Sequence, residues 1–203
     1  MSLKNVYKTA SGAFGVDGYS FKQKNLLKRL DKLDNKGICQ GLCLCHAGMA
    51  KQGIKFKGGG ETGMHSLFEY ANHAQQHFET MGNPDDLNGV TAMYNHLSRN
   101  FHLRIKTIRE FSCAPGEVAN MTQWAWGRAP GYFQILLPNH VVSFHLGDGV
   151  NYFDPNYGMS EFNTFNLFEN FMGFYHTHPD FLTAYGLGHP MPSPRPVFVV
   201  GLE

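Results

Sequence analysis

The stretch HVVSFHLGDGVNYFD, residues 140–154, indicates most clearly which fold this sequence adopts. Two runs rich in β-branched and aromatic residues, 140–146 and 150–154, flank the turn Gly-Asp-Gly, and this pattern predicts an antiparallel hairpin. A three-residue loop at the turn pairs Leu146 with Val150. We therefore expect a hairpin with a defined register, from which the direction of each side chain follows.

The predicted register brings two residues with catalytic potential together. Counting back from the turn sets His140 opposite position 156, with Asp154 diagonal to His140 on the same face of the sheet. A carboxylate in that place fixes the tautomer of the imidazole and stabilises its charged form. His145 stands an odd number of residues from His140, so it points through the other face. We expect His140 and Asp154 to act as a pair; a two-residue loop would reverse the parity and break it.

Helical patterns dominate the first half of the chain and β-rich runs the second. Helices first and strands later predict an α+β fold in which an N-terminal helical lobe packs on a C-terminal antiparallel β-sheet. We expect residues 1–19, rich in Gly and Ser, to form a flexible arm, whose first three residues are compatible with a cloning remnant. Residues 20–203 are expected to form a single domain. Apolar spacing predicts helices at about 21–34, 39–51, 64–78, 84–97 and 161–173, and strands at about 132–137, 140–146, 150–154 and 197–200.

Composition excludes some classes of partner. The 203 residues include 17 basic and 16 acidic ones, and this formal charge of +1 gives no global reason to bind nucleic acid. No apolar run approaches the roughly 20 residues of a membrane span, and the N-terminus lacks the pattern of a Sec signal peptide. Three of the four cysteines fall within seven residues, a poor layout for a disulfide framework, so free thiols are expected: Cys39, Cys43, Cys45 and Cys113.

Cys39 has the sequence context of a nucleophile. It begins a predicted helix, and a helix N-terminus and a nearby imidazolium each favour a thiolate, lowering thiol pKa values to about 3.5–7.5. Gly37 and Gly41 leave the backbone around the sulfur uncrowded. Asn35 offers an amide N–H to an oxyanion beside the backbone N–H of Cys39, although an Asn in this place is also an ordinary helix cap. We expect Cys39 to be activated by His140 as base.

Three blocks of the sequence resemble the catalytic blocks of the YopT/AvrPphB-type cysteine proteases. They are GICQGL at 37–42, HVV at 140–142 and YFDPNYG at 152–158, in the family's order. The resemblance implies a papain-like fold, a catalytic triad of Cys39, His140 and Asp154, and no cofactor. It also implies a virulence function as a type III secretion effector, delivered without a Sec signal from the bacterial cytoplasm into a host cell. The implied partner is a host protein substrate.

The chain departs from that family's pattern beside the nucleophile. A tryptophan commonly follows the cysteine block in the family, whereas here the chain continues Cys43-Leu44-Cys45-His46. Cysteine and histidine so close together also suggest zinc, but one continuous helix cannot wrap four ligands around an ion. Cys43 and Cys45 are therefore expected to be small buried hydrophobic residues.

A second metal pattern lies near the C-terminus. His176-Thr177-His178-Pro179 resembles the motif of JAMM-type zinc isopeptidases, in which His176 and His178 would be ligands. That family places Ser and Asp after the motif, and the corresponding positions here are Leu187 and Pro190, whose side chains cannot bind zinc.

The chemistry of a Cys-His-Asp triad leaves further outcomes open. Proteases, deamidases, transglutaminases and acyltransferases share a thioester intermediate and differ only in the nucleophile that accepts the acyl group. A catalytically silent binding module is a further alternative, in which Cys39 is a buried thiol and Asp154 begins an Asp-Pro turn. We favour a cysteine protease because the three residue types occur together in the expected order.

Overall fold

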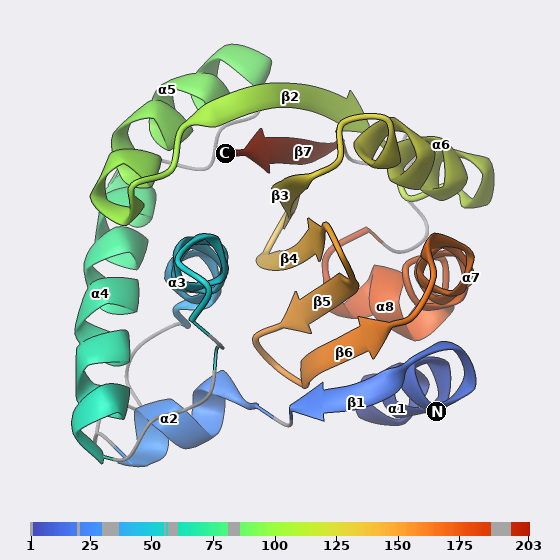
Figure 1. Ribbon diagram of the computed structural model, residues 1–203, viewed down its shortest axis with the longest axis horizontal. Coiled ribbons are helices and arrows are strands. Elements are labelled where there is room, and N and C mark those ends of the chain that lie inside the picture. The colour runs from blue at the N-terminus through green and yellow to red at the C-terminus, as the bar shows by residue number, and fades with distance from the viewer. Residues whose placement is uncertain are drawn as a thin grey trace.

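The computed structural model describes residues 2–19, 21–29, 37–54, 56, 61–80, 86–187 and 196–203. Within them, seven antiparallel strands form one sheet in the order β1-β6-β5-β4-β3-β7-β2, with helices against both faces (Figure 1). None of the described helices is long and apolar enough to cross a membrane. The predicted α+β class with an antiparallel sheet is confirmed.

Most of the helices precede most of the strands, as predicted. The helices are α1 (Leu3–Phe14), α2 (Gln23–Arg29), α3 (Cys39–Lys51), α4 (Glu61–Thr80), α5 (Leu87–Leu97), the 3₁₀ turn η1 (Ser98–Phe101), α6 (Pro115–Trp126), α7 (Phe165–Tyr175) and α8 (Pro179–Ala184). The strands are β1 (Val16–Tyr19), β2 (Ile105–Phe111), β3 (Gly131–Leu137), β4 (His140–Leu146), β5 (Val150–Asp154), β6 (Gly158–Phe162) and β7 (Val197–Leu202).

Side chains of the central strands alternate between two apolar cores. Val141 and Phe153 point to the face that carries α3, outside which α4 and α5 lie (Figure 1). Val142 and Tyr152 point to the opposite face, where α1, α6, α7 and α8 pack. Because both faces are covered, the central strands are apolar on both sides, and β7 is buried along its whole length.

The hairpin of β4 and β5 has the predicted register. Leu146 pairs with Val150 and the ladder continues to Ser143 and Phe153. His140 is the first residue of β4 and Asp154 the last of β5, so antiparallel pairing brings both to the same end of the sheet. The prediction that the two side chains share a face is confirmed.

The prediction of a flexible arm over residues 1–19 is wrong. Leu3–Phe14 is a helix that buries Val6, Tyr7 and Ala10, and Val16–Tyr19 pairs with β6 at the edge of the sheet. The Tyr7 hydroxyl lies 2.8 Å from Ser160 Oγ in β6. The Gly and Ser content suggested a loop, but the apolar residues recur at helical spacing, and tertiary packing outweighs the weak local propensity.

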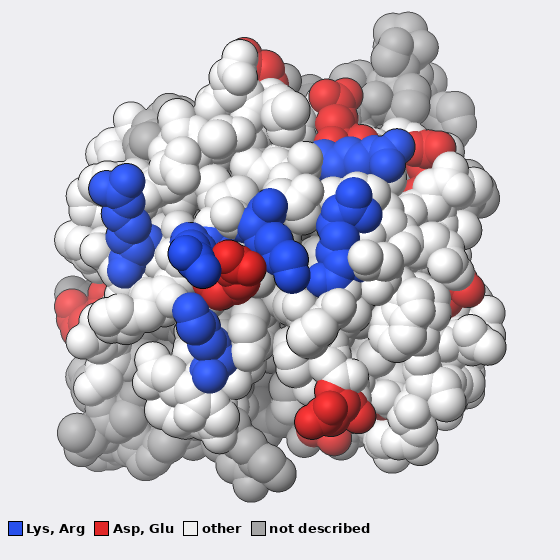
Figure 2. Space-filling view, turned by 45° about the horizontal axis from the view of Figure 1, so that its top comes forward, with Lys and Arg blue, Asp and Glu red and all other residues white. Residues whose placement is uncertain are grey.

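The other edge strand, β2, carries exposed basic residues. Figure 2 brings this end of the molecule forward and shows Lys and Arg side chains spread over it. Arg104, Lys106 and Arg109 are exposed here, and Arg104 Nε lies 2.9 Å from Glu203 Oε1. Charged side chains on an unpaired edge hinder the addition of another strand, so this pattern has an ordinary structural explanation.

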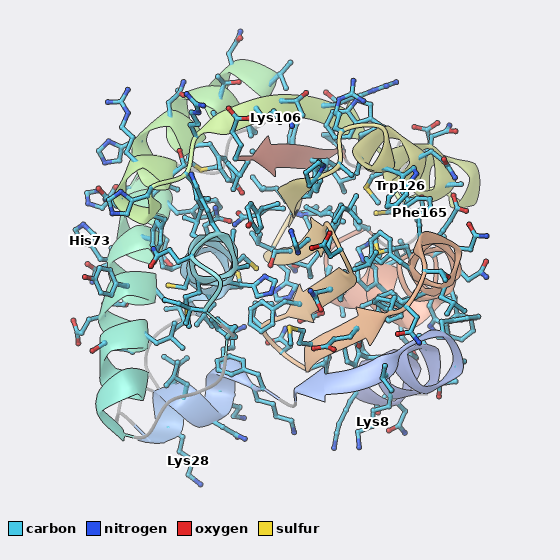
Figure 3. All side chains as sticks on the ribbon, in the orientation of Figure 1. Lys8, Lys28, His73, Lys106, Trp126 and Phe165 are labelled. Atoms are coloured by element: carbon cyan, nitrogen blue, oxygen red, sulfur yellow. The ribbon has the colours of Figure 1, made fainter. Side chains whose placement is uncertain are left out.

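Contacts between α6 and α7 hold α7 against the sheet. The rings of Trp126 and Phe165 stack with centroids 4.5 Å apart, and the two side chains lie together at the ends of these helices (Figure 3). Gln123 Nε2 also donates a hydrogen bond of 2.6 Å to Glu169 Oε1. The contacts matter for the site because the last residue of α7, Tyr175, reaches the carboxylate of Asp154.

Candidate active site

Cys39 begins α3 directly after a turn that requires glycine. Gly37 has φ of 127°, a backbone conformation that residues with a side chain rarely adopt. Gly41 has a different purpose from the one expected, because a Cβ there would lie 1.8 Å from the carbonyl oxygen of Ala71 in α4. Gly41 therefore lets α3 and α4 pack closely, and the two glycines together fix where the helix begins and how it sits.

Glutamine side chains from neighbouring helices bond the first N–H groups of α3. Ile38, the N-cap residue, donates its N–H to Gln23 Oε1 at 2.9 Å, and the Gln40 N–H donates to Gln75 Oε1 at 3.2 Å. The N–H of Cys39 lies between them, in the first turn, where N–H groups have no acceptor within the helix. It is therefore a suitable donor to an oxyanion formed at the sulfur.

His140 and Asp154 form a buried pair at the end of the sheet. The imidazole Nε2 lies 3.0 Å from Asp154 Oδ1, and the exposed fractions of the two residues are 4% and 0%. With Nε2 bound to the carboxylate, the ring nitrogen left for another partner is Nδ1. The Asp154 carboxylate thus sets the orientation of the ring.

The Asp154 carboxylate accepts three further hydrogen bonds. The N–H of Asn156 donates to Oδ1 at 2.8 Å, and the hydroxyls of Tyr175 and Tyr185 donate to Oδ2 at 3.0 and 3.1 Å. Donors to an ionised carboxylate stabilise its negative charge and hold it in position. Three separate parts of the chain therefore hold the Asp154 carboxylate in position.

The surroundings of His140 favour its charged form. Burial, the largest single influence, lowers the pKa of His140, but the charge and hydrogen bond of Asp154 and the contact with Cys39 together raise that pKa to about 10. The ring also stacks on Tyr185 with centroids 4.3 Å apart and planes 6° from parallel. At neutral pH His140 is thus an imidazolium, and its contact with the Cys39 sulfur contributes to that raised pKa.

A cleft of about 490 Å³ opens over Cys39 and His140. Its walls come from α3 and α4 on one side and from the turn between β3 and β4 on the other. Cys39 is partly exposed in this cleft, as a nucleophile must be. The lining residues are Gln23, Gly37, Cys39, Gln75, Phe78, Glu79, Leu137, Pro138, Asn139, His140, Val141, Asn156, Ala184 and Tyr185.

The remaining thiols contrast with Cys39. Cys43, Cys45 and Cys113 are free and buried. Burial raises the pKa of Cys43 well above the ordinary value and raises the pKa values of Cys45 and Cys113 to about 12. These three are protonated and shielded at neutral pH, in agreement with the expectation that Cys43 and Cys45 are small buried hydrophobic residues.

The structure brings Cys39, His140 and Asp154 to one end of the sheet. Asn35, the expected oxyanion donor, lies outside the described residues. His145 points to the other face, as predicted, where its ring stacks on Tyr132 with centroids 4.7 Å apart.

Sequence reasoning missed four residues that support the site. Asn156 belongs to the block around Asp154 and was detectable there, but its bonds were not. Gln23, Tyr175 and Tyr185 carry no motif, and only the packing of α2, α7 and α8 brings them to the carboxylate and the nucleophile turn.

The two histidines of the zinc isopeptidase pattern have other partners. His176 is fully buried with Nε2 3.0 Å from the Tyr152 hydroxyl, whereas His178 caps α8, its Nδ1 accepting the N–H of Asp180 at 3.1 Å. Pro190 lies outside the described residues. Among the residues that the structure does describe, no group of three His, Cys, Asp or Glu side chains is arranged to hold a metal ion.

The fold is similar to those of an avirulence protein and of a cysteine protease-like domain. The crystal structure of the Pseudomonas avirulence protein AvrPphB matches with a TM-score of 0.61 and 13% identity, over 95% of this chain and 99% of that chain. PatoxP, a cysteine protease-like domain of the Photorhabdus asymbiotica toxin PaTox, matches with a TM-score of 0.50 and 14% identity, over 98% of this chain and 57% of that chain. No protein-family model and no curated protein matches the sequence. The chain therefore shares its fold with AvrPphB and with the cysteine protease-like domain PatoxP.

Proposed function

We propose that this protein is a cysteine protease in which Cys39 is the nucleophile, His140 the general acid and base, and Asp154 the residue that orients His140. The observation that carries the proposal is the shared cleft. Cys39 and His140 both line it, and His140 is bonded from behind to a fully buried carboxylate. A protease fold with this cleft is suited to attack on a carbonyl.

The first half of the reaction forms a thioester. The Cys39 thiolate attacks the carbonyl carbon, a C–S bond forms, and the carbonyl electron pair moves onto the oxygen. The backbone N–H of Cys39 stabilises this oxyanion, with Asn35 proposed as the second donor. As the C=O bond re-forms, the C–N bond breaks and the leaving amine takes the proton from His140 Nδ1.

The second half releases the product and restores the pair. Neutral His140 accepts a proton at Nδ1 from a water molecule, whose oxygen attacks the thioester carbon. The second tetrahedral intermediate expels the Cys39 thiolate, and the acid product leaves. His140 is then an imidazolium again, and Asp154 holds the same ring orientation through both halves.

The substrate is proposed to be a protein of a host cell, reached after secretion by a bacterium through a type III pathway. Support comes from the fold, since the matched proteins are an avirulence protein and a domain of a toxin. The order of the three sequence blocks supports the same assignment. Cleavage inside the host would make the protein a virulence factor.

The decisive test compares the wild type with Cys39→Ser in native lysates of plant and animal cells and of a bacterium, followed by mass spectrometry of newly formed protein N-termini. We expect new N-termini with the wild type in a eukaryotic lysate, and none with Cys39→Ser. Cleavage confined to the bacterial lysate would contradict the host assignment, and equal cleavage by both variants would contradict the nucleophile.

The same experiment separates the other reactions of a thioester. Conversion of glutamine to glutamate without chain cleavage would identify a deamidase, and new cross-links or acylated lysines would identify a transferase. Either result would keep the triad and replace the protease. A complete lack of Cys39-dependent products would favour a catalytically silent binding module.

A further inference from the structure

Gln23, the first residue of α2, connects the two halves of the candidate site. Its side-chain oxygen accepts the N–H of Ile38 at 2.9 Å, and Ile38 directly precedes the nucleophile. Its side-chain nitrogen donates to Asn156 Oδ1 at 2.7 Å, and its own backbone N–H donates to the carbonyl oxygen of Pro155 at 2.8 Å. One amide group therefore bonds the turn before Cys39 and the turn after the catalytic carboxylate.

The bonds continue from Asn156 to the imidazole. The N–H of Asn156 donates to Asp154 Oδ1, and its side-chain nitrogen donates to the Tyr185 hydroxyl at 3.3 Å. Tyr185 in turn donates to Asp154 Oδ2 and stacks on the ring of His140. Gln23 is thus linked to both partners of His140, while its other end holds the start of α3.

This connection has a mechanical consequence. Cys39 comes from α3 on one face of the sheet, whereas Asp154 is held by residues packed on the other face. Side-chain hydrogen bonds also join α3 to the sheet, including one from Cys43 Sγ to the Val141 carbonyl oxygen at 3.4 Å, but they bond the helix and not the turn that precedes it. Gly37, in the turn that Gln23 bonds, has no side chain to stiffen it and lies in a conformation open mainly to glycine.

We propose that Gln23 is a positioning residue that sets the place of the Cys39 sulfur relative to His140, by clamping the turn before α3 to the turn after β5. The proposal rests on the proposed function, because it concerns the same thiolate and imidazolium. Reacting groups need their geometry within a fraction of an ångström, and a displacement of about 1 Å can cost about 100-fold in rate.

The test replaces Gln23 with methionine, which has a similar length but makes neither hydrogen bond. Gln123→Met is the matched control, because it removes a hydrogen bond between α6 and α7 that is remote from the cleft. The probe is iodoacetamide, and peptide mass spectrometry gives the alkylation rate of Cys39 from about pH 5 to about pH 10. No substrate is needed.

For the wild type and Gln123→Met we expect Cys39 alkylation at about pH 6 to be about 10- to 100-fold faster than that of free cysteine. Gln23→Met should lose about 10-fold of this rate at about pH 6 while changing less than about twofold at about pH 10, where ordinary thiols also ionise. An equal loss at every pH, or no loss, would overturn the positioning role. Slow labelling of the wild type would instead overturn the proposed function together with this inference.

Two further variants keep the inference testable. Gln23→Glu retains the acceptor for Ile38 but loses the donor to Asn156. We expect a smaller loss of the Cys39 alkylation rate, with the same dependence on pH. This variant tests the inference if Gln23→Met does not fold. The double variant of Asn156→Ala and Gln23→Met should lose little more of the Cys39 alkylation rate than the worse of the two single variants, because both substitutions break the same hydrogen bond. Losses that multiply fully would show that Gln23 does not act through Asn156.

Discussion

Three histidines are buried among the described residues, and their environments shift their pKa values in opposite directions. His140, at the end of the sheet, has its pKa raised to about 10. His46 in α3 and His176 after α7 have pKa values lowered to about 3, mainly by burial. A buried histidine is thus an imidazolium in one place and neutral in the other two.

The partners explain the difference. His46 Nδ1 lies 2.9 Å from the Ser143 hydroxyl and His176 Nε2 lies 3.0 Å from that of Tyr152, and a hydroxyl does not offset the desolvation of a charged ring. His140 faces a carboxylate that accepts hydrogen bonds from other donors as well. Of these three histidines, the one that keeps its charge is the one beside the Cys39 sulfur.

Asp154→Asn has the largest expected effect, because it removes the partner that distinguishes His140 from the other two buried histidines. Without the carboxylate, burial should dominate at His140 and keep the ring neutral at neutral pH, as at His176, so Cys39 loses its charged partner. Peptide hydrolysis is expected to fall by about 10⁴-fold, the scale seen when the orienting carboxylate of a serine protease triad is replaced. Hydrolysis of a peptide found in the lysate experiment gives this rate, and activity within about tenfold of the wild type would contradict the role of Asp154.

The three buried histidines should also affect the pH dependence of stability in opposite ways. His46 and His176 bind protons more readily when unfolded, so their contribution is present above about pH 6.5 and is lost as the pH falls toward about 3. His140 binds its proton more tightly when folded, so its contribution is present below about pH 6.5 and is lost as the pH rises through about 10. Each slope should approach about 1.4 kcal/mol per pH unit for each histidine, the value for a difference of one bound proton.

Urea unfolding at a series of pH values measures these slopes. His176→Gln should flatten the acid side of the stability curve, and His140→Gln should flatten the alkaline side. If His176→Gln changed only the alkaline side, or if both variants kept the wild-type slopes, the assigned charges would be wrong.

His178→Ala has the smallest expected effect. His178 lies at the start of α8, where its ring accepts the N–H of Asp180, so its loss should cost about 1 kcal/mol of stability as an N-cap does. Peptide hydrolysis should change by less than about twofold. A large loss of hydrolysis that added zinc restored would instead revive the zinc isopeptidase hypothesis.

Local patterns predicted the parts of the site that depend on local structure. The pairing of His140 with Asp154 follows from a short hairpin whose loop length sets the register, and alternation then decides the face. The helical pattern predicts that a helix begins at Cys39. It does not predict that α3 packs on the face of the sheet opposite to the one that α7 and α8 cover. That packing depends on long-range contacts, including the hydrogen bond from Cys43 Sγ to the Val141 carbonyl oxygen in β4.

The sequence was less informative where tertiary contacts decide the structure. The Gly and Ser residues of α1 obscure its apolar stripe and predict an arm, and charges interrupt the apolar residues of β2, so the pattern predicts no strand there. Tyr175 and Tyr185 reach Asp154 only through the packing of the C-terminal helices. Spacing along the chain carries no signal for such contacts.

The most direct test of the central claim is an NMR titration of the histidine rings in ¹⁵N-histidine-labelled wild-type protein, with His140→Gln to assign the resonance. We predict that the His140 ring stays doubly protonated through neutral pH and loses its proton only as the pH approaches about 10. His46 and His176 should remain neutral over the same range. A His140 ring that titrates near the ordinary histidine pKa of about 6.5, or that is neutral throughout, would contradict the thiolate–imidazolium pair on which the proposed function depends.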